Sequence, residues 1–275
     1  MRGRTNGSKS HTSAPVERVS GIGSMSSSGA VKDAVRILSY NVHGCRGSDG
    51  RLNPDRVLSV LEAMQPDVAA LQELDAEQER SRGLDQTRYL AEKLDMSYFY
   101  VSARRAGAGH FGNALLSRAP CESIRVAQIP RLHAASEPRA AQWVLVNGPF
   151  GPLHVVNTHF GLRRQEQLLQ AQSLLGEDWL SSGEMGPHFV LCGDLNAMPG
   201  SPAYRALARH LTDAQLASGG RPLRTFPALL PLVRIDHVFL SPALRVERVH
   251  VPGGLARLAS DHRPLVVDVI PRMEH

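Results

Sequence analysis

The stretch HFVLCGDLN, residues 188–196, carries the pattern that decides the fold class of this chain. Its first part, residues 188–194, is an apolar run that ends in an aspartate, and the break at 183–187 separates it from a helical pattern over 164–181. A short apolar run bounded by turn residues is typical of a buried strand. Because this strand follows a helix along the chain, the pattern indicates an α/β protein built in layers.

The alternation of short apolar runs with helical patterns continues outward from this stretch in both directions. We expect further strands at 35–41, 68–73, 98–103, 113–117, 141–146, 153–158, 234–241 and 264–270. A helix is predicted to start at the cap signal Asn53-Pro54, and a second one to span 84–95. In the helix over 164–181, the spacing predicts one apolar face made of Leu168, Ala171, Leu175 and Trp179.

Charge is distributed unevenly along the 275 residues. Residues 1–34 carry +3 of the net charge of +5, so we interpret them as a disordered basic leader, followed by a folded domain at 35–271 and a tail at 272–275. The residues after 34 carry nearly equal numbers of basic and acidic side chains, which argues against a broad basic surface for binding nucleic acid. No apolar run approaches the roughly 18 residues of a spanning helix, and the three cysteines are widely spaced. We therefore expect a cytoplasmic monomer that contacts membranes only peripherally.

Four of the expected strands end in a polar residue that an apolar core cannot use: Asn41, Glu73, His159 and Asp194. In layered α/β folds the carboxyl ends of strands converge on a crevice where ligands bind. The sequence therefore predicts a functional site at that end of the strands.

Two further pairs of residues fit acid–base chemistry. Asp194 and Asn196 share one face of an extended segment. The Asp194 carboxylate is suited to act as a general base on a water molecule, and the Asn196 amide to position a nearby oxygen atom. An Asx-turn that caps the next helix is an equal alternative. Asp236 and His262 fit a pair in which the carboxylate orients the imidazole. The alternative is that each Asp-His dipeptide belongs to a surface turn.

Glu73 follows a largely apolar run, where a carboxylate is costly unless it is paired or binds a cation. Carboxylate and amide oxygens without cysteine suit Mg²⁺ or Mn²⁺ better than Zn²⁺. Pairing with one of the many arginines is the alternative. The sequence has no phosphate-binding P-loop, no GxSxG and no HExxH motif.

Seven motifs in order extend these observations: SYNVHG (39–44), LQE (71–73), FGNALLS (111–117), NTHFG (157–161), GDLN (193–196), RIDHVFLS (234–241) and SDHRPL (260–265). Together they resemble the endonuclease/exonuclease/phosphatase superfamily, over residues 35–271, and most closely its branch of small bacterial metal-dependent hydrolases. The resemblance implies an α/β fold, a four-layer α/β/β/α sandwich of two mixed β-sheets flanked by helices.

The resemblance also implies a role for each matching residue. Its metal positions correspond to Asn41, Glu73 and Asp261, its catalytic positions to Asp194, Asn196, His159, His262 and Asp236, and we add Asn113 and Arg139 as substrate contacts. The implied reaction is an in-line attack of water on a phosphoester, supported by Mg²⁺ or Mn²⁺. We expect a substrate-selecting rim at 103–112, 131–139 and 219–233.

The substrate class is less constrained than the chemistry. We favour a lipid or small-molecule phosphoester, because His159 stands where abasic-site nucleases are expected to have tyrosine and because an aromatic content of 5% offers little stacking surface. A DNA or RNA nuclease is the first alternative. A catalytically inactive protein that binds phosphorylated ligands is the second, and the intact set of polar site residues argues against it.

Overall fold

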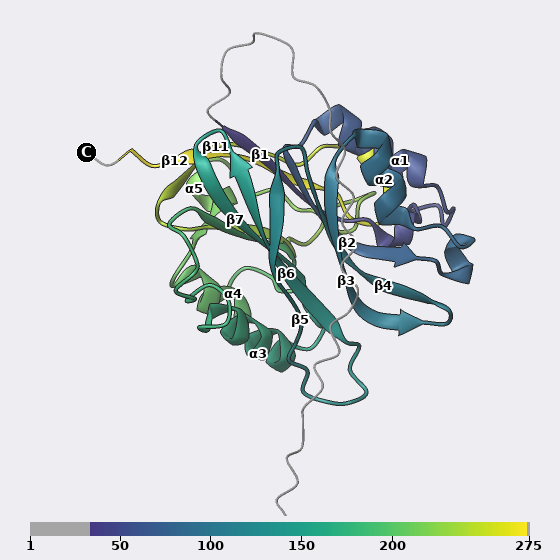
Figure 1. Cartoon of the computed structure of the whole chain (residues 1–275), viewed down its shortest axis with the longest axis horizontal. Helices are drawn as coiled ribbons and strands as arrows, with labels where there is room; N and C mark the ends of the chain where they lie inside the picture. The colour runs from purple at the N-terminus through teal and green to yellow at the C-terminus, as the bar shows by residue number, and fades with distance from the viewer. Residues whose placement is uncertain (1–33, 274–275) are drawn as a thin grey trace, which may run out of the picture.

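The computed structural model describes residues 34–273, which form two six-stranded sheets packed face to face with helices on both outer sides (Figure 1). Apart from residue 34, the expected leader over 1–34 lies outside the described residues, and the expected tail is described only as far as residue 273. Within 34–273, no helix combines the length and the hydropathy that a membrane crossing requires.

The first sheet has the order β11-β12-β1-β2-β4-β3, and the second has the order β5-β6-β7-β8-β10-β9. The strands of the first sheet are β1 Val35–Asn41, β2 Val68–Ala76, β3 Ser97–Ala106, β4 Gly109–Ser117, β11 Leu244–His250 and β12 Leu265–Pro271. Those of the second are β5 Cys121–Ile129, β6 Arg139–Gly148, β7 Gly151–His159, β8 Phe189–Asp194, β9 Thr212–Asp213 and β10 Asp236–Leu240. The pairs β1–β2 and β7–β8 are parallel and the others are antiparallel, so both sheets are mixed as predicted.

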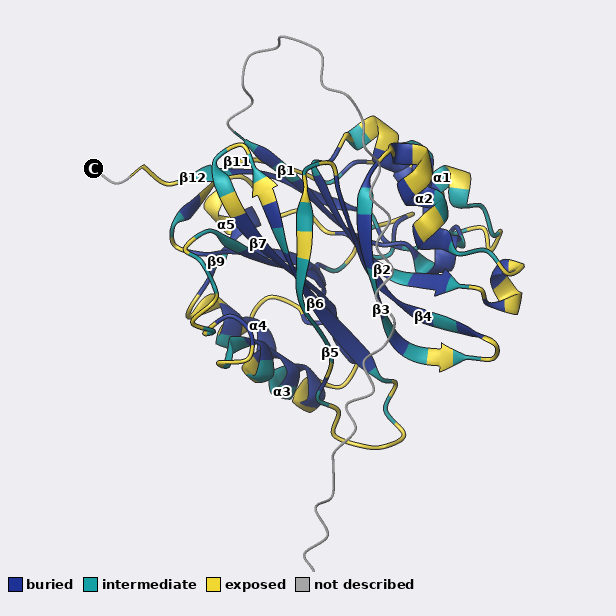
Figure 2. Cartoon of the chain, in the orientation of Figure 1, coloured by how far each residue is buried: buried dark blue, intermediate teal, exposed yellow. Residues whose placement is uncertain are grey.

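The core has three apolar layers. Side chains such as Ile37, Val155 and Val190 fill the space between the two sheets. A second cluster packs α1 (Pro54–Met64) and α2 (Gln86–Leu94) on the outer face of the first sheet. A third packs α3 (Arg164–Leu175) and α4 (Pro202–Ala208) on the outer face of the second. Figure 2 shows the central strands buried and the helices exposing only their outward sides. The predicted four-layer sandwich is confirmed.

The helices follow the local capping signals. They are α1 Pro54–Met64, α2 Gln86–Leu94, α3 Arg164–Leu175, α4 Pro202–Ala208, α5 Ala214–Ala217 and α6 Ala256–Ala259, with single 3₁₀ turns η1 His43–Cys45 and η2 Glu79–Ser81. Asn53 caps α1 as predicted, because its side chain accepts a hydrogen bond from the backbone N–H of Asp55.

The predicted helix over 164–181 is wrong in its end and in its buried face. Helix α3 stops at Leu175, before Gly176, and Trp179 is buried from the turn that follows. The buried face contains Glu166, Gln167, Gln170 and Leu174 beside the predicted Ala171, whereas the predicted Leu168 and Leu175 are only half-buried. The two glutamines hold backbone groups of the loops beside the site, which apolar periodicity cannot reveal.

Three edge strands, β5, β9 and β11, were not predicted, and one predicted loop is a hairpin. Strands β5 and β11 lie at the edges of their sheets and are half exposed, so they lack the apolar runs by which buried strands are recognised. The expected rim loop 103–112 is the end of β3, a tight turn and the start of β4. The hairpin loop between β6 and β7 lies at Gly148–Gly151, as predicted.

Candidate active site

Strand register brings three of the predicted site residues into one row. Asp194 on β8 lies opposite His159 of the parallel β7 and opposite Asp236 of the antiparallel β10. Asn41 ends β1 in the other sheet, and its amide reaches Asp194 across the space between the sheets. The carboxyl ends of the parallel strands therefore meet at one site, as the sequence predicted.

The close approach of β7 and β8 at this row depends on Gly193. A Cβ atom at this position would lie 1.9 Å from the carbonyl oxygen of Thr158, and the residue has a φ of +146°. Only glycine fits there, so GDLN combines a glycine that permits close strand packing with the aspartate that follows it.

Asp194 is buried at the centre of the site. Its Oδ2 accepts a hydrogen bond of 3.0 Å from Asn41 Nδ2, and it lies 3.5 Å from Nε2 of His159 and 3.6 Å from Nε2 of His262. Burial raises the pKa of Asp194 to about 7, against the lowering effect of the His262 charge. A carboxylate with this pKa can exchange a proton with water near neutral pH.

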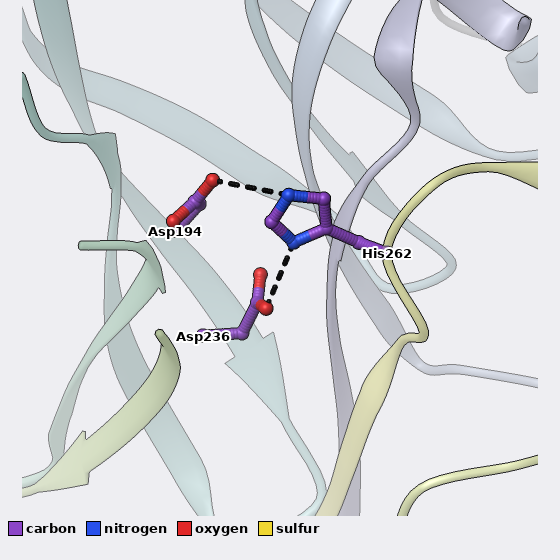
Figure 3. A group of neighbouring side chains, drawn as sticks. All are labelled: Asp194, Asp236 and His262. Carbon is purple, nitrogen blue, oxygen red and sulfur yellow. Dashed lines mark hydrogen bonds and ion pairs between the residues drawn. The ribbon is translucent and has the colours of Figure 1, made fainter. Parts of the chain in front are cut away.

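His262 lies between two carboxylates, as Figure 3 shows. Its Nδ1 is 2.9 Å from Asp236 Oδ2, while its Nε2 faces Asp194. Burial lowers the pKa of His262, but the charges of Asp236 and Asp194 and the hydrogen bond to Asp236 outweigh burial and raise it to about 10. His262 is therefore protonated at neutral pH, and its Nε2–H is a positively charged donor at the site.

His159 is held in the opposite charge state. Arg139 Nη1 donates to its Nδ1 over 2.9 Å, so in the neutral ring the proton lies on Nε2. Burial, followed by the positive charges of Arg139 and His262, lowers the pKa of His159 well below its ordinary value. Glu137 fixes the guanidinium of Arg139 at 2.9 Å. The site thus has one charged and one neutral imidazole N–H directed at the same carboxylate.

Glu73 reaches the site through an irregularity in β2. The pairing with β4 shifts register between Leu71 and Leu74, and Glu73 adopts the left-handed conformation with a φ of +62°. A bulge of this kind re-aims a side chain, and a positive φ away from glycine costs on the order of 1 kcal/mol or more. Asn41 Nδ2 donates to Glu73 Oε1 over 2.9 Å and so bridges Glu73 and Asp194.

The loop that carries Asn196 is held from two sides. Asn196 has a φ of +47°, and its backbone N–H donates to Asp194 Oδ1 over 2.9 Å. Gln167 Nε2 donates to the carbonyl oxygen of Asn196, and His237 Nε2 lies 2.8 Å from that of Ala197. The side-chain amide of Asn196 donates to the Phe160 carbonyl over 3.0 Å and lies 3.2 Å from His159 Nε2.

The two remaining predicted residues lie at the margin of this cluster. Asp261 is joined to it through Ser260, whose hydroxyl donates to the carbonyl oxygen of Asn41 and lies 3.3 Å from Asp261 Oδ1. Asn113 is buried, and its amide donates to the Ala140 carbonyl over 3.0 Å. It thereby ties β4 to β6, and its predicted contact with substrate stays a prediction.

Several side chains of the site carry atoms of the kind that ligate metal ions. Asp194, Asp236 and His262 offer ligand atoms within 4.8 Å of one another, and Glu73 and Asn41 add oxygen-bearing side chains on the other side of Asp194. The oxygen donors are carboxylates and an amide, with no thiol among them, which is a hard donor set, whereas the protonated His262 has no free ring nitrogen to bind a metal ion. Such a set, with two imidazole donors beside it, is suited to stabilising the negative charge of a phosphoester in reaction.

Comparison with known proteins agrees with the geometry. A model of the endonuclease/exonuclease/phosphatase family matches residues 38–262. The chain belongs to this family. Its members are typically phosphoester hydrolases and usually use divalent metal ions. The resemblance that the seven motifs indicated is therefore confirmed.

The individual proteins that this chain resembles are distant from it in sequence. The uncharacterized protein YbhP of Escherichia coli K12 is 26% identical over an alignment of 251 residues that covers 85% of this chain and 95% of YbhP. The endonuclease/exonuclease/phosphatase from Bacteroides vulgatus is 20% identical with a TM-score of 0.72, covering 88% of this chain and 100% of the other. The mannosyl-6-phosphatase Bt3783 of Bacteroides thetaiotaomicron is 20% identical with a TM-score of 0.64, covering 86% and 99%. The two structures show the shared fold.

Several residues of the candidate active site were not predicted from the sequence. We assigned no role to His43, yet its Nδ1 lies 3.6 Å from Asp261 Oδ1. The ring of Phe226, from the expected rim segment 219–233, packs on His262 with centroids 4.7 Å apart. Gln167 was not among the residues predicted for the apolar face of its helix, yet it is buried. The motif RIDHVFLS contains His237 next to Asp236, a signal that we read only for its aspartate.

Acid is expected to destabilise the fold through His237. Burial, and next the charge of Arg234, lower the pKa of His237 from 6.5 to about 4, while Asp213 opposes both. Because the folded chain binds this proton more weakly than the unfolded chain, the stabilisation is complete above pH 6.5 and is lost as the pH falls towards 4. When the pH is lowered from 7 to 4.5, we expect the free energy of unfolding to fall by about 2 kcal/mol less in His237→Gln than in the wild type.

Urea unfolding at a series of pH values measures this difference. The matched control is His210→Gln at an exposed histidine, whose pH dependence should follow that of the wild type. Parallel curves for wild type and His237→Gln would show that His237 does not titrate in the way its surroundings require.

Proposed function

We propose that the chain is a metal-dependent phosphoester hydrolase that cleaves its substrate by in-line attack of a water molecule. The observation that carries this proposal is the surroundings of Asp194 Oδ2, where N–H groups of Asn41, His159 and His262 approach within 3.0–3.6 Å. A buried base beside two imidazole donors places proton abstraction next to charge stabilisation. No covalent intermediate on the protein is required.

Each residue has a distinct part in this reaction. Asp194 takes the proton of the attacking water, which its pKa of about 7 permits near neutral pH. His262 donates a charged hydrogen bond to a phosphoryl oxygen, and the neutral His159 donates a second one. Asp236 and Arg139 are positioning residues, because each fixes the proton arrangement of one imidazole.

The divalent metal is proposed to be held by Glu73, with Asn41 and Asp261 beside it, as Mg²⁺ or Mn²⁺. The donor chemistry fits, since these side chains supply carboxylate and amide oxygens. In the structure Asn41 directs its amide nitrogen at Glu73 and accepts the His43 backbone N–H on its oxygen, so its direct ligation is the least supported of the three. When bound, the ion would supply Lewis-acid stabilisation of the phosphoryl oxygens.

The proposed substrate is a lipid or small-molecule phosphoester. The body of the chain is nearly balanced in charge. Among the described residues, Phe226 is the aromatic ring that packs on His262, and one ring offers little stacking surface for a nucleic acid. A neighbour in fold is the mannosyl-6-phosphatase Bt3783. The family also contains nucleases, so cleavage of DNA or RNA is the alternative that a substrate panel must test.

Glu73→Gln tests the metal site directly. We expect the Kd for Mg²⁺ to rise about tenfold or more, because a neutral amide replaces the carboxylate, and phosphoester hydrolysis to fall with it. Isothermal titration calorimetry measures the binding independently of turnover. Glu62→Gln on the exposed side of α1 is the matched control and should bind as the wild type does. Unchanged Mg²⁺ binding by Glu73→Gln would contradict the assignment.

A further inference from the structure

The segment between α5 and β10 carries an unusual group of exposed aliphatic side chains. We call residues 221–232 the leucine loop. Leu229, Leu230 and Leu232 are 48%, 68% and 57% exposed, and Leu223 is 40% exposed. Single exposed leucines are ordinary, but several on one loop are costly in water and mark an interaction surface.

The same loop is basic without any acidic counterpart. The sequence has no Asp or Glu between Asp213 and Asp236. Arg221, Arg224 and Arg263 line a pocket of about 320 Å³ beside the loop. Among the described residues none of the three forms an ion pair with a carboxylate, so the surface combines aliphatic side chains with uncompensated positive charge.

The leucine loop is attached to the active site. Phe226 packs on the ring of His262, and the backbone N–H of Ala228 donates to the Asp261 carbonyl. Arg263, the residue after His262, donates from Nε to the Ala228 carbonyl over 2.7 Å. Phe226 and Ala228 therefore join the leucine loop to His262 and its two neighbours in sequence.

We infer that the leucine loop docks on the headgroup region of a bilayer that contains anionic lipids, and that it presents a lipid phosphoester to the site. This inference rests on the proposed hydrolase function and specifies its substrate class. The leucines would enter the boundary with the acyl chains while Arg221, Arg224 and Arg263 contact lipid phosphates, the combination by which proteins bind membranes peripherally.

Other occupants fit the surface less well. Protein interfaces take most of their binding energy from Trp, Tyr and Arg, and leucine is under-represented among such residues. Sites for single-stranded nucleic acid combine positive charge with aromatic rings for stacking, whereas the exposed hydrophobic side chains of the leucine loop are aliphatic. The uncompensated arginines complement the negative surface of an anionic bilayer.

Vesicle sedimentation tests this inference without turnover. We would use the full chain with Asp194→Asn, and vesicles of phosphatidylcholine with or without about 30% phosphatidylglycerol. We expect binding to the anionic vesicles that weakens with salt, and a loss of roughly tenfold or more in Leu229→Ser/Leu230→Ser. The control Met273→Ser, which removes a side chain that is 77% exposed beyond β12, should bind like its parent.

The outcomes separate the docking surface from the hydrolase. All variants keep residues 1–33, so any binding by the basic residues there is common to them. Equal vesicle binding by the double leucine variant would overturn the docking surface, as would leucine-dependent self-association or RNA binding without vesicle binding. The hydrolase itself is tested with the soluble substrate bis-p-nitrophenyl phosphate. If only the hydrolase proposal fails, vesicle binding persists while wild type shows no phosphoester turnover.

Discussion

Asp194→Asn is expected to lower kcat for phosphoester hydrolysis by roughly 10³- to 10⁴-fold, the largest single effect that the site predicts. The substitution keeps the shape and the hydrogen-bonding capacity of the side chain but removes its ability to accept a proton from water. The remaining rate reflects charge stabilisation by His159 and His262, which the variant retains. Single-turnover kinetics with saturating Mg²⁺ measure the chemical step.

The control for this substitution is Asp268→Asn. Asp268 is also a buried carboxylate with a basic partner, because it binds Arg36 over 2.7 Å and 2.9 Å, but it lies on β12 outside the site. Its variant should keep the wild-type kcat, and circular dichroism should show both variants folded. A folded Asp194→Asn variant with a kcat within a few fold of wild type would remove Asp194 from the role of base.

Asp236→Asn is expected to lower kcat by roughly 10²- to 10⁴-fold at neutral pH, because an amide cannot stabilise the imidazolium of His262. Asp236 is the largest raising influence on the pKa of His262, and its Oδ2 fixes Nδ1 of the ring. The pKa of His262 should therefore fall from about 10. A ¹⁵N NMR titration of His262 in the variant measures this shift directly.

The NMR titration also separates positioning from general destabilisation. A variant that is merely less stable loses activity at every pH, whereas loss of the His262 charge makes the activity fall more steeply as the pH rises. Retention of the wild-type His262 titration in a folded Asp236→Asn variant would show that Asp236 does not control the ring.

The sequence was informative where a strand end and a polar residue coincide. His159 and Asp194 close the parallel strands β7 and β8, so register alone places them side by side. Asn41 closes β1 of the other sheet and reaches Asp194 because the two sheets pack face to face. Asp236 and His262 belong to segments far apart in the chain. Their residue types suggested a carboxylate paired with an imidazole, a surface turn was the alternative, and the structure has the pair with a hydrogen bond of 2.9 Å.

Other features depend on interactions that a linear pattern does not contain. The bulge that aims Glu73 is a mismatch between β2 and β4, and nothing in LQE alone requires it. The charge state of His159 follows from Arg139, a residue 20 positions earlier on a neighbouring strand. Gln167 and Gln170 point inward because backbone groups of the site loops need partners, which overrides the apolar periodicity of α3.

The most direct test is hydrolysis by wild type and Asp194→Asn of a panel of bis-p-nitrophenyl phosphate, phospholipids, inositol phosphates, RNA, and plasmid and abasic DNA, each with Mg²⁺ or with EDTA. We predict turnover of lipid or small phosphoesters that requires Mg²⁺ and Asp194, with nucleic acids left intact. Nicking of DNA that requires Asp194 would assign the site to a nuclease instead. Absence of turnover with every substrate, by folded protein, would contradict the hydrolase and favour a phospholigand-binding protein.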